Sequence, residues 1–175
     1  MSETTPTAPD LNDRRTRLKY KMAEARQELV STLQALTPEQ LSLPTRNEGW
    51  NVGQVAAHIC AAEGGMEPIA HRILSQEPNQ RENAASFDLN RFNNGMIKRR
   101  VDKTIPELIE ELNTSRARML EIIDRVSDEE LDLPGYHPAA GDITLYGLFV
   151  VIYRHERDHA EDIRKAVEAG TATSV

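Results

Sequence analysis

The stretch VIYRHERDHAEDIRK, residues 151–165, places apolar residues and histidines on one face of a helix. His155 follows Val151 and Ile152 at the spacing of one turn, and His159 follows His155 by one further turn. Residues three and four apart lie on the same side of an α-helix, so both histidines continue the apolar stripe that faces a core. The charged residues of the stretch fall mainly on the other sides. The pattern therefore predicts a core-packed helix with two inward-facing histidines.

Three further segments show the same helical period. Together with the last helix, they cover residues 13–36, 51–74, 87–126 and 142–169. Asn51 with Gln54, and Thr104 with Glu107, have the spacing of capping boxes, and the second box is expected to interrupt the third segment. No run of residues alternates with period two, so no β-sheet is expected. The prediction is an all-α four-helix bundle with short extra helical turns in its connections.

The composition suits a single globular domain. Hydrophobic residues make up 39% of the 175 residues, which is enough for one substantial core. We expect a disordered N-terminal arm over residues 1–12, the helical bundle over residues 13–169 and a disordered tail over residues 170–175.

Two linkers resemble each other. LTPEQLSLP at residues 36–44 and VSDEELDLP at residues 126–134 both follow a long helix. Each has an apolar residue, a hydroxyl at the expected N-cap (Thr37 or Ser127), an acidic first turn and the pattern Leu-x-Leu-Pro. One interpretation is a common helix-to-helix linker. The other is a pseudo-twofold bundle of two helical hairpins, which would bring the second and fourth helices to equivalent positions facing one interior.

Charge and cysteine content argue against several classes of protein. The net charge of −7 repels phosphate backbones and anionic lipid surfaces. No stretch approaches eighteen consecutive apolar residues, and the first residues lack the apolar core of a signal peptide. The single cysteine, Cys60, allows no internal disulfide and is expected to be a small buried side chain. We expect a cytoplasmic protein that binds neither nucleic acid nor membranes.

Two buried imidazoles one turn apart need a shared partner. Protonated rings would repel each other, and neutral rings need hydrogen bonds at both nitrogens, whereas one divalent cation can accept a nitrogen from each. A third ligand must then come from elsewhere: His71 lies near the end of the second helix and His137 lies in a loop. His58 lies in the body of the second helix beside its apolar stripe, so we expect it to join His155 and His159. The alternative for His58 is a histidine at the core edge, hydrogen-bonded to a backbone carbonyl.

The strings GWNVGQVAAHI at residues 49–59 and HERDH at residues 155–159, in this order, resemble the DinB/YfiT superfamily. The resemblance covers nearly the whole chain. It implies a four-helix bundle, often of unusual helix order, with a divalent metal held by three histidines, here His58, His155 and His159. Known relatives include metal-dependent hydrolases and transferases that use bacillithiol, mycothiol or glutathione, and they are often homodimers. In one branch, the mycothiol-dependent maleylpyruvate isomerases, a glutamate often stands at the position of His155.

The ligand set determines what a bound ion could do. Three neutral imidazoles leave its double charge uncompensated, which strongly acidifies a bound water or thiol, and zinc, nickel, iron and manganese all accept such ligands. With the resemblance, this leads us to expect a thiol S-transferase that acts on a small electrophilic molecule, with a metal-bound thiolate as nucleophile and a low-molecular-weight thiol as cosubstrate. The alternatives are a hydrolase with metal-bound hydroxide, a non-catalytic metal-binding stress protein, and a metal-free bundle that acts through its surface.

Three further residues are candidates for the surroundings of the site. Asp162 follows His159 by three residues and could orient an imidazole N–H. Asn94, one turn after Asn90, and Tyr136, in the loop before the last helix, could border a substrate pocket.

Three glutamates close to the ligands in sequence are not expected to take part in the site. Glu63 and Glu67 are expected to be solvated. Glu156 is expected to form a surface salt bridge with Arg157 or Arg164.

Overall fold

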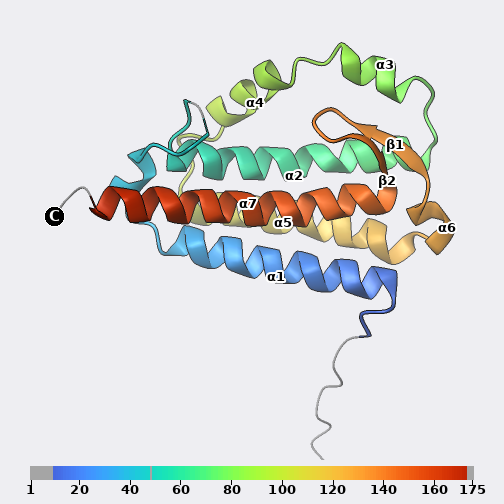
Figure 1. Cartoon of the computed structure of the whole chain (residues 1–175), viewed down its shortest axis with the longest axis horizontal. Coiled ribbons are helices and arrows are strands. Elements are labelled where there is room, and N and C mark those ends of the chain that lie inside the picture. Colours follow the sequence, from blue (N-terminus) through green and yellow to red (C-terminus); the bar gives the residue numbers. More distant parts are fainter. Residues whose placement is uncertain (1–9, 48, 173–175) are drawn as a thin grey trace, which may run out of the picture.

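The computed structural model describes residues 10–47 and 49–172 and is predominantly helical (Figure 1). Its four long helices are α1 (Arg14–Gln34), α2 (Val52–Leu74), α5 (Ile105–Arg125) and α7 (Leu145–Ala172). Residues 1–9 of the expected arm and 173–175 of the expected tail lie outside the described residues. Residues 10–12 form a turn ahead of α1, and residues 170–172 continue α7. The predicted four-helix bundle is confirmed.

The order of the long helices around the bundle differs from their order in sequence. Helices α1 and α7 run in one direction and α2 and α5 in the other (Figure 1). Helix α7 packs against both α1 and α2, and α5 packs against the same two helices from the other side. Because α2 and α7 are direct neighbours, side chains from both can meet in the interior, as the pseudo-twofold interpretation of the linkers requires.

Polar caps define where the helices begin. The Asn51–Gln54 and Thr104–Glu107 capping boxes are both present, at the starts of α2 and α5. Each box satisfies backbone N–H groups that the first turn of a helix leaves unpaired. Helix α7 starts after Thr144, whose hydroxyl accepts the N–H of Gly147 at 3.0 Å.

The two similar linkers each form a short helical turn. The first contains the 3₁₀ helix η1 (Glu39–Ser42) and the second contains α6 (Asp128–Leu131). Ser127 caps α6 in a third capping box. Thr37 does not cap η1, which has Pro38 at that position and no side-chain cap, so this prediction was wrong.

The expectation of no sheet was also wrong, because a short hairpin precedes α7. Strands β1 (Pro134–His137) and β2 (Gly141–Thr144) pair antiparallel, with His137 opposite Gly141. Four-residue strands are too short to show a clear alternating pattern. The hairpin lies so close to α2 that a Cβ atom on Gly135 would stand 2.3 Å from Cγ1 of Ile73. Glycine at this position therefore allows the hairpin to press against the helix.

The segment between α2 and α5 arches over the outer side of α2 (Figure 1). It contains α3 (Gln80–Ala85) and α4 (Leu89–Lys98). Helix α4 packs against α2, and α3 contacts strand β1. The predicted interruption of the third helical segment is confirmed, since α4 and α5 are separate helices. Together with the hairpin, the arch adds a partial outer layer to one side of the bundle.

Four buried charges divide the core into two apolar clusters. One cluster includes Met22, Met66, Met119 and Ile152, and the other includes Leu29, Ile59, Leu112 and Ala160. On each long helix, one charged residue stands between members of the two clusters. These residues, called the charge layer below, are Arg26, Glu63, Arg116 and Glu156.

The charge layer is a closed set of ion pairs. Nε of Arg26 donates to Glu156 at 2.8 Å, and Nη2 of Arg26 forms an ion pair with Glu63. Arg116 donates to Glu63 and to Glu156, both at 2.7 Å. Each carboxylate thus bridges both guanidinium groups, and the four formal charges cancel, as burial of charge demands.

No helix of the described chain is both long and apolar enough to cross a membrane.

Candidate metal centre

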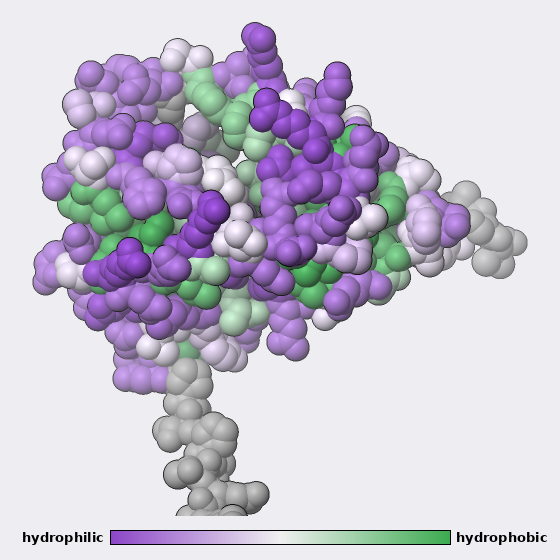
Figure 2. Space-filling view, turned by 180° about the vertical axis from the view of Figure 1, so that it is seen from behind, coloured by the Kyte–Doolittle hydropathy of each residue, from purple (hydrophilic) through white to green (hydrophobic). Residues whose placement is uncertain are grey.

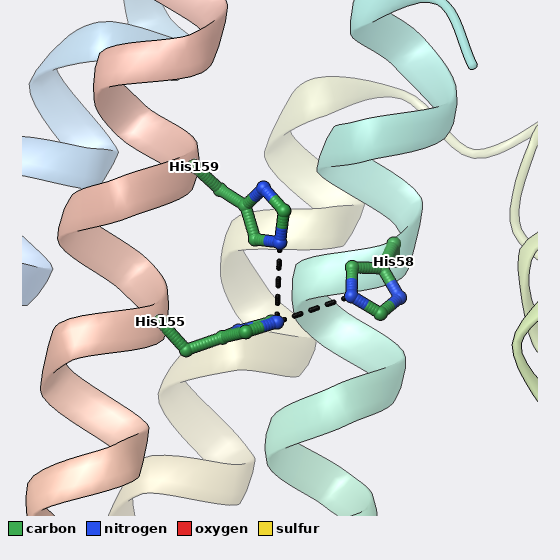
Figure 3. A group of neighbouring side chains, drawn as sticks. All are labelled: His58, His155 and His159. Carbon is green, nitrogen blue, oxygen red and sulfur yellow. Dashed lines mark hydrogen bonds between the residues drawn. The ribbon is translucent and has the colours of Figure 1, made fainter. Parts of the chain in front are cut away.

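The three predicted ligands converge between α2 and α7. His58 projects from α2 and His155 and His159 project from α7, with their ring nitrogens pointing toward one another (Figure 3). Nε2 of His155 lies 3.1 Å from Nε2 of His58 and 3.1 Å from Nε2 of His159. Three nitrogens bound to one ion at about 2.1 Å in tetrahedral geometry would stand about 3.4 Å apart. The observed spacing is close to that value.

The hydrogen bonds of His159 determine which of its nitrogens can bind an ion. Its Nδ1 lies 3.2 Å from Oδ2 of Asp162, a carboxylate that can only accept, so this nitrogen carries the proton. In the neutral ring, Nε2 then presents a lone pair toward His58 and His155. A carboxylate behind a ligand imidazole is the usual arrangement at metal sites, because it fixes the orientation of the ring and strengthens the ligand.

The loop before α2 holds Asp162 in place. Nδ2 of Asn47 donates to Oδ2 of Asp162 at 3.1 Å, and Arg46 forms an ion pair with Oδ1. The loop is closed by a backbone hydrogen bond of 3.0 Å from Val52 to Leu43. The orientation of His159 therefore depends on a segment distant from it in sequence.

On the side of its Nδ1 atom, His58 is held by packing and not by a hydrogen bond. The ring of Trp50 lies 4.8 Å from the His58 ring, centroid to centroid. Nδ1 of His58 is buried and has no hydrogen-bond partner among the described residues. The expected alternative, a hydrogen bond to a backbone carbonyl, is therefore not made at this nitrogen.

Burial favours the neutral form of all three imidazoles. It lowers the pKa of His58 to about 4, and the neighbouring His159 adds to this shift. Burial also holds the pKa of His155 well below its ordinary value, again with a contribution from His159. It lowers the pKa of His159 despite the opposing effect of Asp162. Three neutral imidazoles whose Nε2 atoms face one another can each offer a lone pair to one divalent cation.

A cavity of about 570 Å³ reaches two of the three histidines. It lies between α2, α7, the hairpin and the α3–α4 segment, and His58 and His155 form part of its wall. The face in Figure 2 is largely hydrophilic with separate apolar patches, and it is hollowed beneath the α3–α4 segment. This volume is typical of pockets for small organic molecules.

The hairpin contributes His137 and Tyr136 to the cavity wall. Nδ1 of His137 accepts the backbone N–H groups of Ala139 and Ala140 at 3.1 and 3.0 Å. Burial lowers the pKa of His137, which favours the neutral ring. A neutral ring that accepts at Nδ1 carries its proton on Nε2, so the hairpin presents one fixed N–H donor.

The remaining candidates occupy different positions. Asn94 is exposed, and Asn93 lines the cavity in its place. Cys60 is buried, as predicted, and donates from Sγ to the carbonyl of Leu108.

Two predictions about the glutamates were wrong. Glu63 and Glu156 are buried in the charge layer rather than solvated or paired at the surface. The sequence did contain a signal for both. Glu63 follows Ile59 and Glu156 follows Ile152 by one turn, so each stands within an apolar stripe.

Comparison with known proteins identifies a family. A family model described as the DinB superfamily matches residues 21–163. Among curated proteins, none is significantly similar in sequence to the chain.

Several solved structures share the fold. The mycothiol-dependent maleylpyruvate isomerase superposes with a TM-score of 0.70 at 13% identity; the match covers 90% of this chain but only 63% of the isomerase. YfiT from Bacillus subtilis, "a probable metal-dependent hydrolase with an unusual four-helix bundle topology", gives 0.69 at 17% identity and covers 98% of this chain and 95% of YfiT. A further four-helix bundle protein gives 0.60 at 18% identity, covering 86% of this chain and 98% of its own. At these identities the structures establish the shared fold and no shared activity.

Proposed function

The chain belongs to the DinB superfamily, and from its site we propose that it is a divalent-metal-dependent enzyme that joins a low-molecular-weight thiol to an electrophilic small molecule. The observation that carries the proposal is the convergence of His58, His155 and His159 at the wall of a cavity. A cavity that ends on two of three ligands allows a substrate to approach the ion. A purely structural metal site would have no need of such an opening.

The residues of the chain have distinct tasks in this proposal. The three imidazoles would hold the ion, and a bound ion would lower the pKa of a thiol that enters the cavity. Asp162 keeps the His159 ring in the tautomer that leaves Nε2 free. The apolar walls exclude water, which strengthens every electrostatic interaction inside.

His137, which lines the cavity, is the proposed donor to the electrophile. When sulfur bonds to carbon of a conjugated carbonyl compound, the displaced electron pair moves onto the carbonyl oxygen, and the proton of the thiol goes to solvent. The fixed Nε2–H of His137 would donate to that oxygen as its negative charge develops. A proton from solvent then completes the addition.

Hydrolysis is the second candidate. It is favoured by the length of the match to YfiT, which is nearly complete for both chains, whereas the isomerase is matched over less than two thirds of its length. The same residues would then act on a water molecule instead of a thiol.

The experiment begins with metal analysis of the purified protein and of His159→Ala. We expect about one divalent ion per chain in the wild type and a loss of most of it in the variant, because two imidazoles make a poor site. His71→Ala is the matched control, since His71 is exposed and far along α2. Equal metal content in all three proteins would contradict the proposal.

A second measurement separates transfer from hydrolysis. The metal-loaded protein is assayed with a panel of electrophiles, with and without glutathione, bacillithiol and mycothiol. Turnover that requires one of these thiols supports transfer. Turnover that no thiol changes supports hydrolysis, and metal without any turnover favours a non-catalytic binding protein.

A further inference from the structure

Arg72 lies on the same face of α2 as the metal ligand His58. Both side chains line the cavity, and Ala62, Met66 and Ile69 line it between them at helical spacing. With a rise of about 1.5 Å per residue, the Cα atoms of His58 and Arg72 are about 20 Å apart along the helix axis. Side chains on a helix lean toward its N-terminus, so Arg72 leans back toward His58. The cavity is therefore elongated, with imidazoles toward one end and a guanidinium toward the other.

The Arg72 guanidinium has no hydrogen-bond or ion-pair partner among the described residues, although its residue is half-buried. Three other arginines in the described part of the chain likewise lack a partner, namely Arg91, Arg99 and Arg154, and all three are exposed to solvent. A solvated arginine needs no partner. A partly desolvated one normally pairs with an anion, because burial of an unpaired charge costs free energy.

The rest of the cavity wall offers no competing anion. Its lining contains no aspartate or glutamate, and most of it is apolar or aromatic, including Met66, Ile69, Phe87, Leu89, Phe92 and Val151. An anionic ligand would meet one cation and no repelling carboxylate in the wall. The apolar surface between the two ends would contact the body of the ligand.

We propose that the cavity binds an elongated, largely apolar molecule with one carboxylate or sulfonate, which Arg72 holds at the end remote from the histidines. The assignment of the opposite end of the ligand to the reaction rests on the proposed function. The anion site itself does not, since Arg72 is not part of the metal centre. The expected substrate is then an amphipathic anion rather than any small electrophile.

The test uses two probes of the same shape, 6-phenylhexanoate and the uncharged 6-phenylhexanamide. Binding is measured by titration calorimetry to the full chain after removal of metal with a chelator, so that the carboxylate cannot bind an ion instead. We expect the wild type to bind the carboxylate at least about tenfold more tightly than the amide, the lower limit for a charge-assisted hydrogen bond. Arg72→Gln should abolish this preference, and Arg72→Lys should retain part of it.

Arg99→Gln is the matched control, because it removes the same charge from an exposed arginine without a partner. It should leave the preference for the carboxylate unchanged. Failure of the wild type to bind 6-phenylhexanoate would overturn the inference, as would equal binding of the two probes or an equal loss in Arg72→Gln and Arg99→Gln. None of these outcomes depends on whether the histidines bind metal, so the anion site and the proposed enzyme can fail separately.

Discussion

Asp162 accepts hydrogen bonds from His159 and Asn47, and this arrangement leads to a prediction for metal affinity. Asp162→Asn keeps the size of the side chain but removes the charge that fixes the His159 tautomer. We expect divalent-metal affinity to fall about 10- to 100-fold, the usual effect of losing such a partner. Competition with a chromophoric chelator measures the change. Asp158→Asn, an exposed change of the same charge on the same helix, should have little effect, and an equal loss in both variants would contradict the prediction.

The titration of His58 predicts how the metal-free protein responds to pH. Its pKa is about 4 in the folded protein against 6.5 ordinarily, so between these values the unfolded chain binds more protons and stability falls as the pH falls. With this shift, His58 alone makes the folded state about 3 kcal/mol less stable at pH 4 than at pH 7. Urea denaturation of chelated protein between pH 7.5 and 5 measures the slope. In His58→Gln the slope should be smaller, and an unchanged slope would show that His58 does not cause it.

At the scale of the elements, the long helices could be predicted from the sequence, and the hairpin could not. Apolar spacing and capping boxes specify a helix within its own segment, as Asn51 with Gln54 and Thr104 with Glu107 do. Strands β1 and β2 depend instead on contact with α2, at a place where Gly135 meets Ile73. The cavity wall could not be predicted from the sequence either, because the hairpin and the α3–α4 segment form it only when they fold onto α2.

Gly135→Ala tests the close packing of the hairpin, which forms part of the cavity wall, against α2. The added Cβ would stand 2.3 and 2.5 Å from the Cγ1 and Cδ1 atoms of Ile73, which is fully buried. We expect a loss of about 1–3 kcal/mol in the free energy of unfolding, as for other overpacked sites. Gly95→Ala on α4, where nothing lies within 4 Å, should be neutral or slightly stabilising. In an Ile73→Ala background, Gly135→Ala should cost less, and an undiminished cost would exclude this clash as the cause.

At the scale of the whole molecule, the convergence of the three histidines was easier to predict than the ion pairs of the charge layer. His58, His155 and His159 continue apolar stripes, and a histidine in an apolar stripe is a candidate metal ligand. Glu63 and Glu156 also stand in apolar stripes. Because glutamate is rarely buried, however, the residue type alone predicts a position at the surface. Only the meeting of four helices reveals two cations that make burial of both carboxylates tolerable. The pairing is a property of the bundle and of no single helix.

The charge layer should therefore tolerate the removal of one charge poorly and the joint removal of one cation and one anion better. Glu63→Gln leaves Arg26 and Arg116 with one carboxylate between them, and we expect urea denaturation to show a loss of about 3–5 kcal/mol, as when one partner of a buried pair is removed. Combining it with Arg26→Gln restores neutrality, so the double variant should be more stable than the sum of the single losses predicts. Glu67→Gln, one turn further along α2 in a half-exposed pair with Arg118, should cost no more than about 1 kcal/mol. An equally small loss of stability in Glu63→Gln and Glu67→Gln would show that the charge layer does not hold the two halves of the core together. Strictly additive losses of stability in the double variant would show that its charges act independently.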